Sequence, residues 1–484
     1  MAEDSLKGKT AKGIAWSAVD RFSAQGIQFV FNILIARILL PEDYGAVAML
    51  NIFIAIANTF IDSGFTRALI RKKDRTQVDY STVFFFNIAV STLFCMILWL
   101  AAPLIASFYD IPILTKITRV FSLTLIINSF GAIQGTHLTI ELNFRKKAII
   151  SIATISAVGS IGLFLASKGF GVWTLVGQCI VSSLVSVSLL WCLSGWRPSL
   201  AFSWTSLKEM FGFGSKLLVS SLIDALYNNI YTIVIGKVYN PSSLGVYNRA
   251  ESFASFPSSN FYGIINSVSF PVLCSIQDQR ERLRSSFRQF IRLSAYLVFP
   301  MMVGLAVVCD PFINTILNEN WQESVPLLRI LCFALVLYPF DALNLSFPNI
   351  LGRSDWYLKV LIINKVVDVL VLVVTIPMGL TALCWGRVAG YGICFFVNTY
   401  YTNKLIDYGP LRQLKDMLPI ILQSAAMGGL VFLVTRPIQS NPVKLLVGIA
   451  VGAVFYLLVS ILTKSEEYHY IKDLIMSRLG NGRS

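Results

Sequence analysis

Polar side chains recur at helical spacing inside an otherwise apolar stretch near the start of this 484-residue sequence. Arg21, Gln25, Gln28 and Asn32 follow one another at steps of four, three and four residues, which places them on one face of a helix. Amide groups can donate and accept hydrogen bonds to a hydroxyl-rich ligand, and a guanidinium can bind a phosphate. This stripe therefore predicts a helix face that contacts a polar, anionic ligand.

Three other apolar stretches have stripes of the same kind. Their polar and aromatic members are Asn51, Asn58 and Asp62; Lys216, Ser220, Asp224, Asn228 and Tyr231; and Arg249, Phe253, Phe256 and Asn260. From these stripes we predict a substrate-binding set of Arg21, Gln25, Gln28, Asn32, Asn51, Asn58, Lys216, Asn228, Tyr231 and Arg249. Asp224, Asp341 and Asp368 are candidate carboxylates for coupling to a proton or sodium gradient. An alternative for Asn51 and Asn58 is that they only join helices by hydrogen bonds.

The elements that position these residues must cross a membrane. Hydrophobic residues make up 55% of the chain and charged residues 14%, whereas soluble domains carry about 25% charged residues. A span needs about 20 apolar residues, which predicts an all-α polytopic protein of fourteen transmembrane helices. We expect them at 13–38, 44–64, 80–107, 117–138, 148–166, 170–193, 211–236, 245–272, 286–308, 325–350, 358–378, 381–402, 418–435 and 444–463.

The distribution of basic residues orients these spans. With the N-terminus in the cytoplasm, 26 of the 40 lysines and arginines lie at cytoplasmic segments and 7 at the opposite side. Cytoplasmic loops carry the excess of basic residues in membrane proteins. The pattern therefore predicts an inner-membrane protein of bacteria with both termini cytoplasmic, and the net charge of +14 indicates orientation rather than a nucleic-acid partner.

A repeat of twelve residues indicates two related halves. Residues 34–45 (LIARILLPEDYG) recur as residues 234–245 (VIGKVYNPSSLG), with a basic residue, a proline and a glycine at matching places. Because six spans separate the copies, both run in the same direction across the membrane, as in transporters with parallel repeats. We predict an N-terminal lobe of residues 1–193, a cytoplasmic linker of 194–209, a C-terminal lobe of 210–402, and two further helices with a tail in 403–484.

The sequence argues against an enzyme or a resident cofactor. Loops between the spans do not exceed about twenty residues, which leaves no room for a separate catalytic domain. The chain has no Walker A motif, and its eight cysteines contain no C-x-x-C pair. We expect no cofactor and no metal site.

Charges inside the spans point to an internal polar cavity. Thirteen ionisable residues lie at membrane depth, and exposing all of them to lipid would cost roughly 40 kcal/mol. A cavity with cations and amides suits a lipid-linked pyrophosphate sugar, whose phosphates bind basic groups and whose glycan binds the amides. The predicted partners are this lipid-linked oligosaccharide and membrane lipids, together with a polysaccharide polymerase or glycosyltransferase complex.

Several short segments resemble the polysaccharide-exporter branch of the MOP flippase superfamily. They are residues 62–73 (DSGFTRALIRKK), 141–146 (ELNFRK), 195–203 (GWRPSLAFS), 270–278 (FPVLCSIQD) and 350–355 (ILGRSD). The resemblance covers about residues 1–410. It implies two six-helix lobes as in MATE transporters, alternating access, and export of an undecaprenyl-pyrophosphate-linked oligosaccharide for O-antigen, capsule or exopolysaccharide.

The chain departs from its superfamily at two places. Relatives often have an acidic residue shortly before the Ile-Gly-Lys segment, where this chain has Tyr231 and its neighbours, and the arginine that lipid II flippases place in the second span is missing. Two alternatives therefore stay open. One is a MATE-like cation or drug antiporter, and the other is a membrane ligase or polymerase of lipid-linked glycans.

Overall fold

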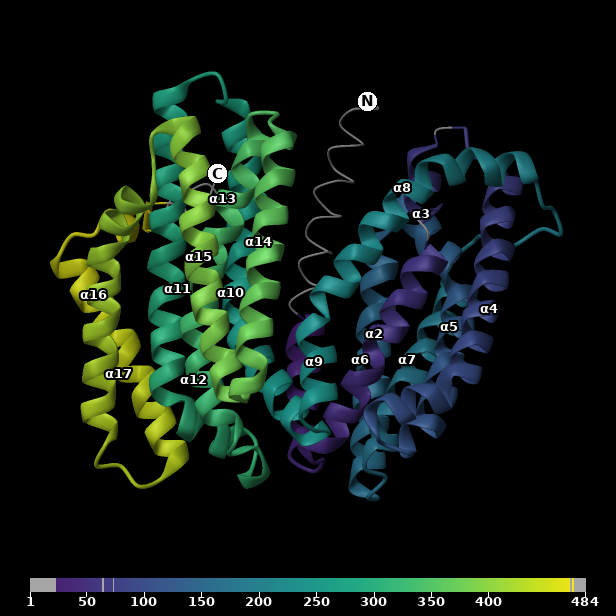
Figure 1. Cartoon of the computed structure of the whole chain (residues 1–484), viewed down its shortest axis with the longest axis horizontal. Coiled ribbons are helices and arrows are strands. Elements are labelled where there is room, and N and C mark those ends of the chain that lie inside the picture. Colours follow the sequence, from purple (N-terminus) through teal and green to yellow (C-terminus); the bar gives the residue numbers. More distant parts are fainter. Residues whose placement is uncertain (1–22, 63–64, 73, 471, 474–484) are drawn as a thin grey trace, which may run out of the picture. The chain divides into compact units, whose positions relative to one another are not determined.

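The computed structural model describes residues 23–62, 65–72, 74–470 and 472–473, except for the side chains of residues 67, 213–217 and 220. These residues form helices joined by turns and loops, and this described part contains no β-strand (Figure 1). The chain divides into two compact units, residues 1–245 and residues 246–484.

The first unit contains nine described helices and the start of a tenth. They are the helix Ser23–Ala36, α2 (Pro41–Asp62), α3 (Phe65–Arg71), α4 (Gln77–Tyr109), α5 (Ile113–Ile140), α6 (Phe144–Ser167), α7 (Val172–Leu193), α8 (Trp204–Asn228), α9 (Ile230–Val238) and the first turn of α10 (Pro241–Ser275). Helix α5 packs against α4 and α7, while α2 packs against α8. Since α8 begins at Trp204, part of the predicted linker 194–209 is helical; the lobe boundary there stays a prediction.

The second unit contains the rest of α10 and the C-terminal helices. They are α11 (Arg280–Ile316), α12 (Ser324–Leu335), α13 (Tyr338–Ile350), α14 (Ser354–Thr375), α15 (Leu380–Ile406), α16 (Pro410–Thr435) and α17 (Asn441–Leu462), with short 3₁₀ turns at Glu319–Trp321 and Ile376–Met378. Helix α11 packs against α12, α16 and α17, and α15 packs against α12, α13 and α14.

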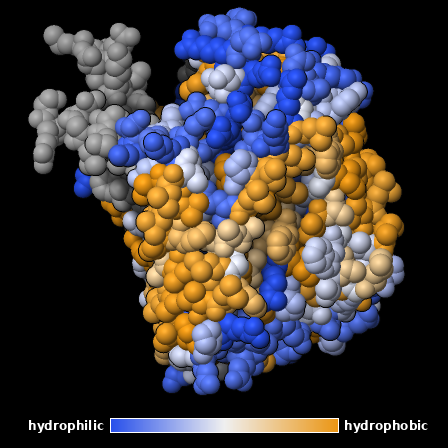
Figure 2. All heavy atoms as spheres, turned by 90° about the vertical axis from the view of Figure 1, so that its left-hand side faces the viewer, coloured by the Kyte–Doolittle hydropathy of each residue, from blue (hydrophilic) through white to orange (hydrophobic). Residues whose placement is uncertain are grey.

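The predicted all-helical membrane fold is confirmed. Eleven helical segments among the described residues are long and apolar enough to cross a membrane. Of the other three predicted spans, one falls on the apolar helix Ser23–Ala36, whose described part is shorter than a full span. The other two fall on α8 with α9 and on α10, which do not combine the length and the hydropathy of a span. On the side that carries α16 and α17, hydrophilic residues gather at the upper end above a largely hydrophobic band (Figure 2).

Two predicted spans are interrupted. The span at 211–236 is broken after Asn228, where the side chain of Asn229 donates a hydrogen bond to the carbonyl of Ala225 at 2.8 Å. Such side-chain bonds compete with helix continuation. The span at 325–350 is broken between Leu335 and Tyr338, because Pro339 favours the start of a new helix.

A buried cluster holds the upper end of the first unit together. Phe65 and Leu69 of α3 pack with Phe84 of α4 and with Trp196, and all four side chains are at most 5% exposed. The indole of Trp196 donates a hydrogen bond to Gln77 Oε1 at 2.8 Å. Both the apolar body and the polar edge of this tryptophan are therefore satisfied.

A charged clamp lies beside this cluster. Lys72 Nζ lies 3.0 Å from Asp79 Oδ1 and 3.1 Å from Glu209 Oε2, and it thereby links α4 to α8. Partial burial alone would lower the pKa of Lys72, but the hydrogen bonds to both carboxylates outweigh burial and raise the pKa. Asp79 also caps α4 through Thr76.

The two copies of the sequence repeat contact each other within the first unit. Each copy ends where a helix begins, α2 at Pro41 and α10 at Pro241. Gly45 lies against Pro241, and Gly245 lies against Pro41. The predicted repeat therefore corresponds to two helix starts that pack reciprocally, proline against glycine.

Candidate functional site

The first polar stripe lies on the helix Ser23–Ala36. Gln28 and Asn32 are exposed and Gln25 is half-buried, so the amides face outward from the first unit. Arg21, which begins the stripe, lies outside the described residues. Beside the stripe on the same helix, the ring of Phe31 packs against Gly159 of α6. The helix therefore contacts its neighbour with an aromatic side chain and presents amides outward.

Helix α2 likewise has exposed polar residues on one face and buried apolar residues elsewhere. Asn51, Asn58 and Asp62 are exposed, whereas residues such as Met49 and Ile52 are at most 2% exposed. The spacing of seven and four residues keeps the three polar groups on one face. An exposed amide or carboxylate on a membrane-crossing helix is costly in lipid, so we interpret this face as water-facing.

Helix α8, which packs against α2, continues the pattern. Asp224 and Asn228 are exposed, and Tyr231 on the following helix α9 is half-buried. Lys216 lies in α8, but its side chain is outside the described residues. The structure thus places the polar residues of the second and seventh predicted spans on neighbouring helices of one unit.

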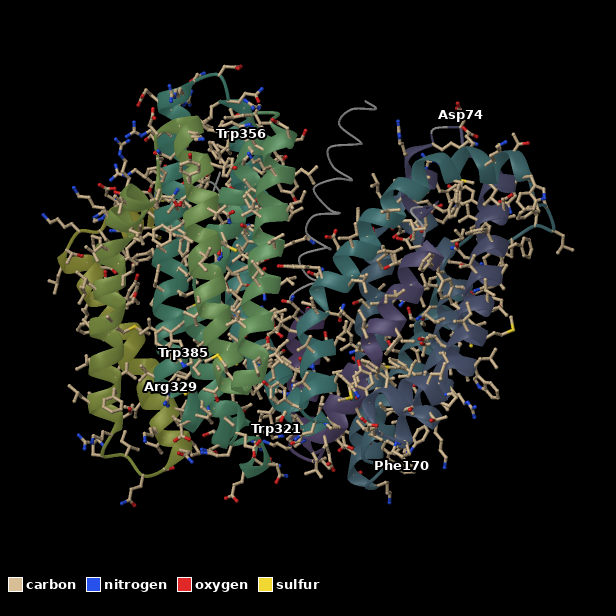
Figure 3. The ribbon with its side chains drawn as sticks, viewed as in Figure 1. Asp74, Phe170, Trp321, Arg329, Trp356 and Trp385 are labelled. Atoms are coloured by element: carbon tan, nitrogen blue, oxygen red, sulfur yellow. The ribbon has the colours of Figure 1, made fainter. Side chains whose placement is uncertain are left out.

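Arg249 lies in the second unit and is surrounded by aromatic rings. Its guanidinium carbon lies 5.1 Å from the ring centre of Trp321 and 5.9 Å from that of Phe253. These distances are typical of cation–π contacts. Figure 3 shows Trp321 near the lower end of the second unit, and Trp356 near its upper end. Arg249 therefore belongs to the aromatic region at one end of this unit.

Asp341 of α13 takes part in a buried amide network. Its side chain is 7% exposed, and Oδ1 accepts a hydrogen bond from Asn398 Nδ2 of α15 at 3.3 Å. Asn398 Oδ1 in turn accepts a hydrogen bond from Asn364 Nδ2 of α14 at 2.9 Å. The other carboxylate oxygen of Asp341 is buried and has no hydrogen-bond partner among the described residues.

Asp368 lies one helical turn beyond Asn364 on α14 and is half-buried. Its Oδ1 lies 3.2 Å from the point that a Cβ on Gly390 of α15 would occupy. The absence of a side chain at Gly390 therefore lets the carboxylate approach α15 closely. Of the three predicted coupling carboxylates, Asp341 and Asp368 lie on neighbouring helices of the second unit, whereas Asp224 belongs to the first.

One buried ion pair was not part of the predicted site. Arg387 of α15 donates hydrogen bonds to Glu251 and to Tyr247 Oη, the latter at 2.5 Å, and both partners lie on α10. The side chain of Arg387 is 13% exposed and that of Glu251 is 32% exposed. Tyr247 and Glu251 are four residues apart, which places them on one helix face. The four-residue spacing of Tyr247 and Glu251 was the feature of the sequence that could have indicated a polar face of α10 at this place.

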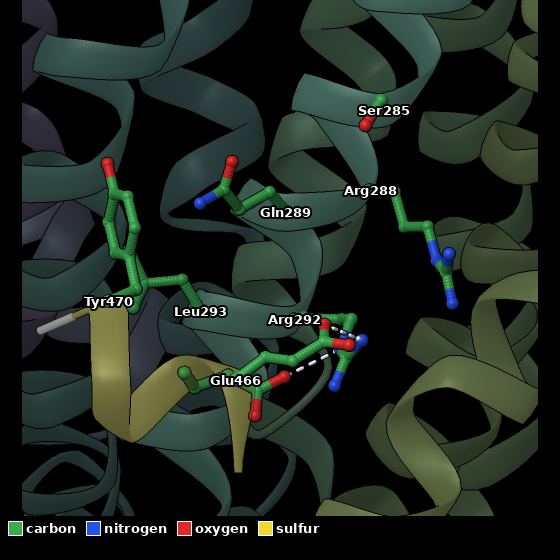
Figure 4. A pocket seen from close by; sticks show the side chains of 8 residues that line it. Ser285, Arg288, Gln289, Arg292, Leu293, Glu466 and Tyr470 are labelled. Atoms are coloured by element: carbon green, nitrogen blue, oxygen red, sulfur yellow. Dashed lines mark hydrogen bonds and ion pairs between the residues drawn. The ribbon is translucent and has the colours of Figure 1, made fainter.

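Two arginines of α11 are also paired. Arg288 binds Asp416 of α16 through two hydrogen bonds of 2.6 and 2.8 Å. Arg292 bridges Glu466 and Glu467 at 2.6 and 2.5 Å. Figure 4 shows Arg292 beside Glu466. No group of three or more metal-ligating side chains was found in the described part of the chain.

The sequence is similar to those of a known protein family. The sequence matches the family described as polysaccharide biosynthesis protein over residues 34–326. Lipopolysaccharide biosynthesis protein WzxC of Escherichia coli (strain K12) is 28% identical over 334 residues, which cover 68% of this chain and 67% of WzxC. Teichuronic acid biosynthesis protein TuaB of Bacillus subtilis (strain 168) is 26% identical over 467 residues, 94% of this chain and 95% of TuaB.

Solved structures share the fold. The lipid II flippase MurJ, in an inward closed conformation, has a TM-score of 0.74 at 17% identity and covers 96% of this chain and 100% of its own. An inward-facing MATE-family multidrug transporter of the MOP superfamily has a TM-score of 0.60 at 16% identity, covering 78% of this chain and 94% of its own. With the family match extending over more than half of its residues, this chain belongs to the polysaccharide biosynthesis protein family and has the fold of MOP-superfamily transporters.

Proposed function

We propose that this protein is a flippase that moves an undecaprenyl-pyrophosphate-linked oligosaccharide across the bacterial cytoplasmic membrane by alternating access. The observation that carries the proposal is the set of exposed amides on α2 and on the apolar helix Ser23–Ala36 of the first unit, in a chain of this family. Both matched relatives are named for the biosynthesis of surface polysaccharides, and MurJ is named as a lipid II flippase.

The amides suit a glycan. Gln28, Asn32, Asn51 and Asn58 are exposed, and each amide side chain supplies both donors and acceptors for sugar hydroxyls. In this proposal Arg21, Lys216 and Arg249 attract the pyrophosphate, since Arg and Lys form charge-assisted hydrogen bonds with phosphate oxygens. Asn228 and Tyr231 complete the contacts with the sugar.

The buried carboxylates of the second unit suit ion coupling. Asp341 has one carboxylate oxygen hydrogen-bonded by Asn398 and a second oxygen with no described partner. Carboxylates inside membrane bundles commonly serve proton or ion relays. In this proposal Asp341, together with Asp368, binds the coupling proton or sodium ion, and both chain termini lie in the cytoplasm beside the enzymes that assemble and polymerise the glycan.

Transport by the reconstituted full-length protein tests the function. The substrate is a fluorescent lipid-linked pyrophosphate oligosaccharide, and the measurement is its exposure to a membrane-impermeant quencher. We expect Asn51→Ala combined with Asn58→Ala to slow flipping about fivefold, from the loss of two hydrogen-bonding groups. Asn320→Ala, an exposed asparagine in the turn before α12, is the matched control and should leave the rate unchanged.

Two results would contradict the proposal. One is transport of lipophilic cations without movement of the lipid-linked glycan, which would favour the MATE-like antiporter. The other is a lengthened or transferred glycan in the same vesicles, which would favour a ligase or polymerase.

A further inference from the structure

A cleft of about 420 Å³ lies at the N-terminal ends of α11 and α16 in the second unit. It is lined by Glu281, Arg284, Ser285, Arg288, Tyr408, Arg412, Lys415 and Asp416. Ser285 and Arg288 also line the neighbouring pocket that Figure 4 shows. The proposed transport does not use this cleft.

The lining has an excess of positive charge. Arg284, Arg288, Arg412 and Lys415 are cations, against the carboxylates of Glu281 and Asp416. Asp416 is already engaged, because it accepts both hydrogen bonds of Arg288 and a third from the hydroxyl of Tyr408 at 2.9 Å. The remaining cations therefore outnumber the carboxylates that could neutralise them.

Two of these cations make no ion pair or hydrogen bond with the described residues. Arg284 is half-buried and Lys415 is exposed, and neither has a partner within the part of the chain that the structure covers. Arg412 lies in the first turn of α16, a turn that contains no acidic residue. Cations are unfavourable at the positive end of a helix dipole, where an anion is stabilised. The first turn of α16 therefore carries a cation at a place where an anion would be stabilised.

The position of the cleft indicates where such an anion would come from. Both α11 and α16 are long and apolar enough to cross a membrane, so their N-terminal ends lie near headgroup level. On α16, Leu411 beside the cations and Leu418 and Leu422 farther along the helix are 78%, 49% and 61% exposed. Their spacing of seven and four residues forms one apolar face suited to acyl chains.

We propose that this cleft binds the phosphate group of an anionic membrane lipid, through Arg284, Lys415 and Arg412, with the acyl chains along the exposed leucines of α16. Basic pockets between membrane-crossing helices bind anionic headgroups in this way. The phosphate takes the place of the carboxylate that is missing from the first turn of α16. Arg288 and Asp416, which form an ion pair, also line the cleft.

The test measures thermal stabilisation of the purified full-length protein during titration with phosphatidylglycerol. Phosphatidylcholine in one arm, and inorganic phosphate or glycerol phosphate in another, separate lipid headgroup from soluble phosphate. We expect phosphatidylglycerol alone to stabilise the protein. Arg284→Gln combined with Lys415→Gln should raise the half-saturating lipid concentration about 25-fold, at about a factor of five for each cation.

Two further variants complete the test. Arg436→Gln with Lys444→Gln removes the same charge from the C-terminal end of α16 and the first turn of α17, far along α16 from the cleft, and should leave the titration unchanged. Arg284→Lys with Lys415→Arg keeps the charge and should retain lipid binding. An unchanged titration in the Gln variant, or an equal loss in the Arg436 and Lys444 control, overturns the site. Full stabilisation by soluble phosphate overturns the assignment to lipid.

Discussion

Gly45 lies so close to the backbone of Pro241 that a Cβ added to the glycine would be 1.8 Å from the proline carbonyl oxygen. The same distance separates a Cβ on Gly245 from the carbonyl oxygen of Pro41. In the first contact the glycine belongs to the first copy of the repeat and the proline to the second copy, and in the second contact the reverse is true. Both close approaches are therefore consequences of one local, approximately two-fold arrangement.

Alanine at either glycine should disrupt this packing. The obstructing atom is backbone, which cannot rotate away, so we expect Gly45→Ala to destabilise the protein by about 1–3 kcal/mol and to slow transport. Gly429→Ala on α16 is the control, because a Cβ there meets nothing within 4 Å. Thermal melting in detergent gives the measurement. Equal melting temperatures for the two variants would show that the close contact has no energetic importance.

Replacement of Asp341 by asparagine should separate folding from ion coupling. The variant keeps an oxygen that can accept the hydrogen bond from Asn398, so the network and the amount of folded protein should persist. It cannot bind or release a proton at this position. We expect flipping in proteoliposomes to lose its acceleration by an imposed proton or sodium gradient. Glu319→Gln, an exposed carboxylate in the turn before α12, should respond to the gradient as the natural protein does.

A single substitution that breaks the ion pair of Arg387 and Glu251 should destabilise the protein more than a double substitution that removes both charges. Arg387→Met leaves the carboxylate of Glu251, which is 32% exposed, without its cation, and we expect this to cost about 1–3 kcal/mol. The double change to methionine removes both charges and should recover most of that loss. A double-mutant cycle of melting temperatures measures the coupling. Additive losses in the cycle would contradict a direct interaction.

Stability of the first unit should depend on the clamp of Lys72. Its pKa is raised by Asp79 and Glu209, so the stabilisation is fully present below the ordinary lysine pKa and is lost as pH rises through the raised value. We expect Lys72→Met to lower the melting temperature at pH 8 and to have less effect at pH 11. Lys208→Met, an exposed neighbour of Glu209, is the control. A pH-independent difference would refute an electrostatic cause.

Local patterns predicted most of the fold. Hydropathy located the helices because a membrane span must be about 20 apolar residues long. The polar residues predicted on one face of α2 are exposed together, because helical spacing is regular, and their role in binding a substrate stays a prediction. The repeat predicted two related halves, and the structure shows that each copy contains a helix start, at Pro41 and at Pro241, since proline favours the first helical position.

The sequence could not predict which polar residues of different helices pair with one another. Arg387 and Glu251 are 136 residues apart, and nothing local indicates that α15 and α10 bring them together. The amide network joins Asn364, Asn398 and Asp341 from three helices, for the same reason. Arg288 and Arg292 likewise form ion pairs with acidic residues more than 100 positions away.

The hairpin of α16 and α17 makes the two halves of the chain distinguishable. Its main packing partner is α11 of the second unit, and the repeat pairs the first twelve predicted spans without including it. In electron micrographs, particles with two similar halves are easily aligned the wrong way round. An antibody fragment raised against the exposed turn between Thr435 and Asn441 would mark one half alone, and would give each particle an unambiguous orientation.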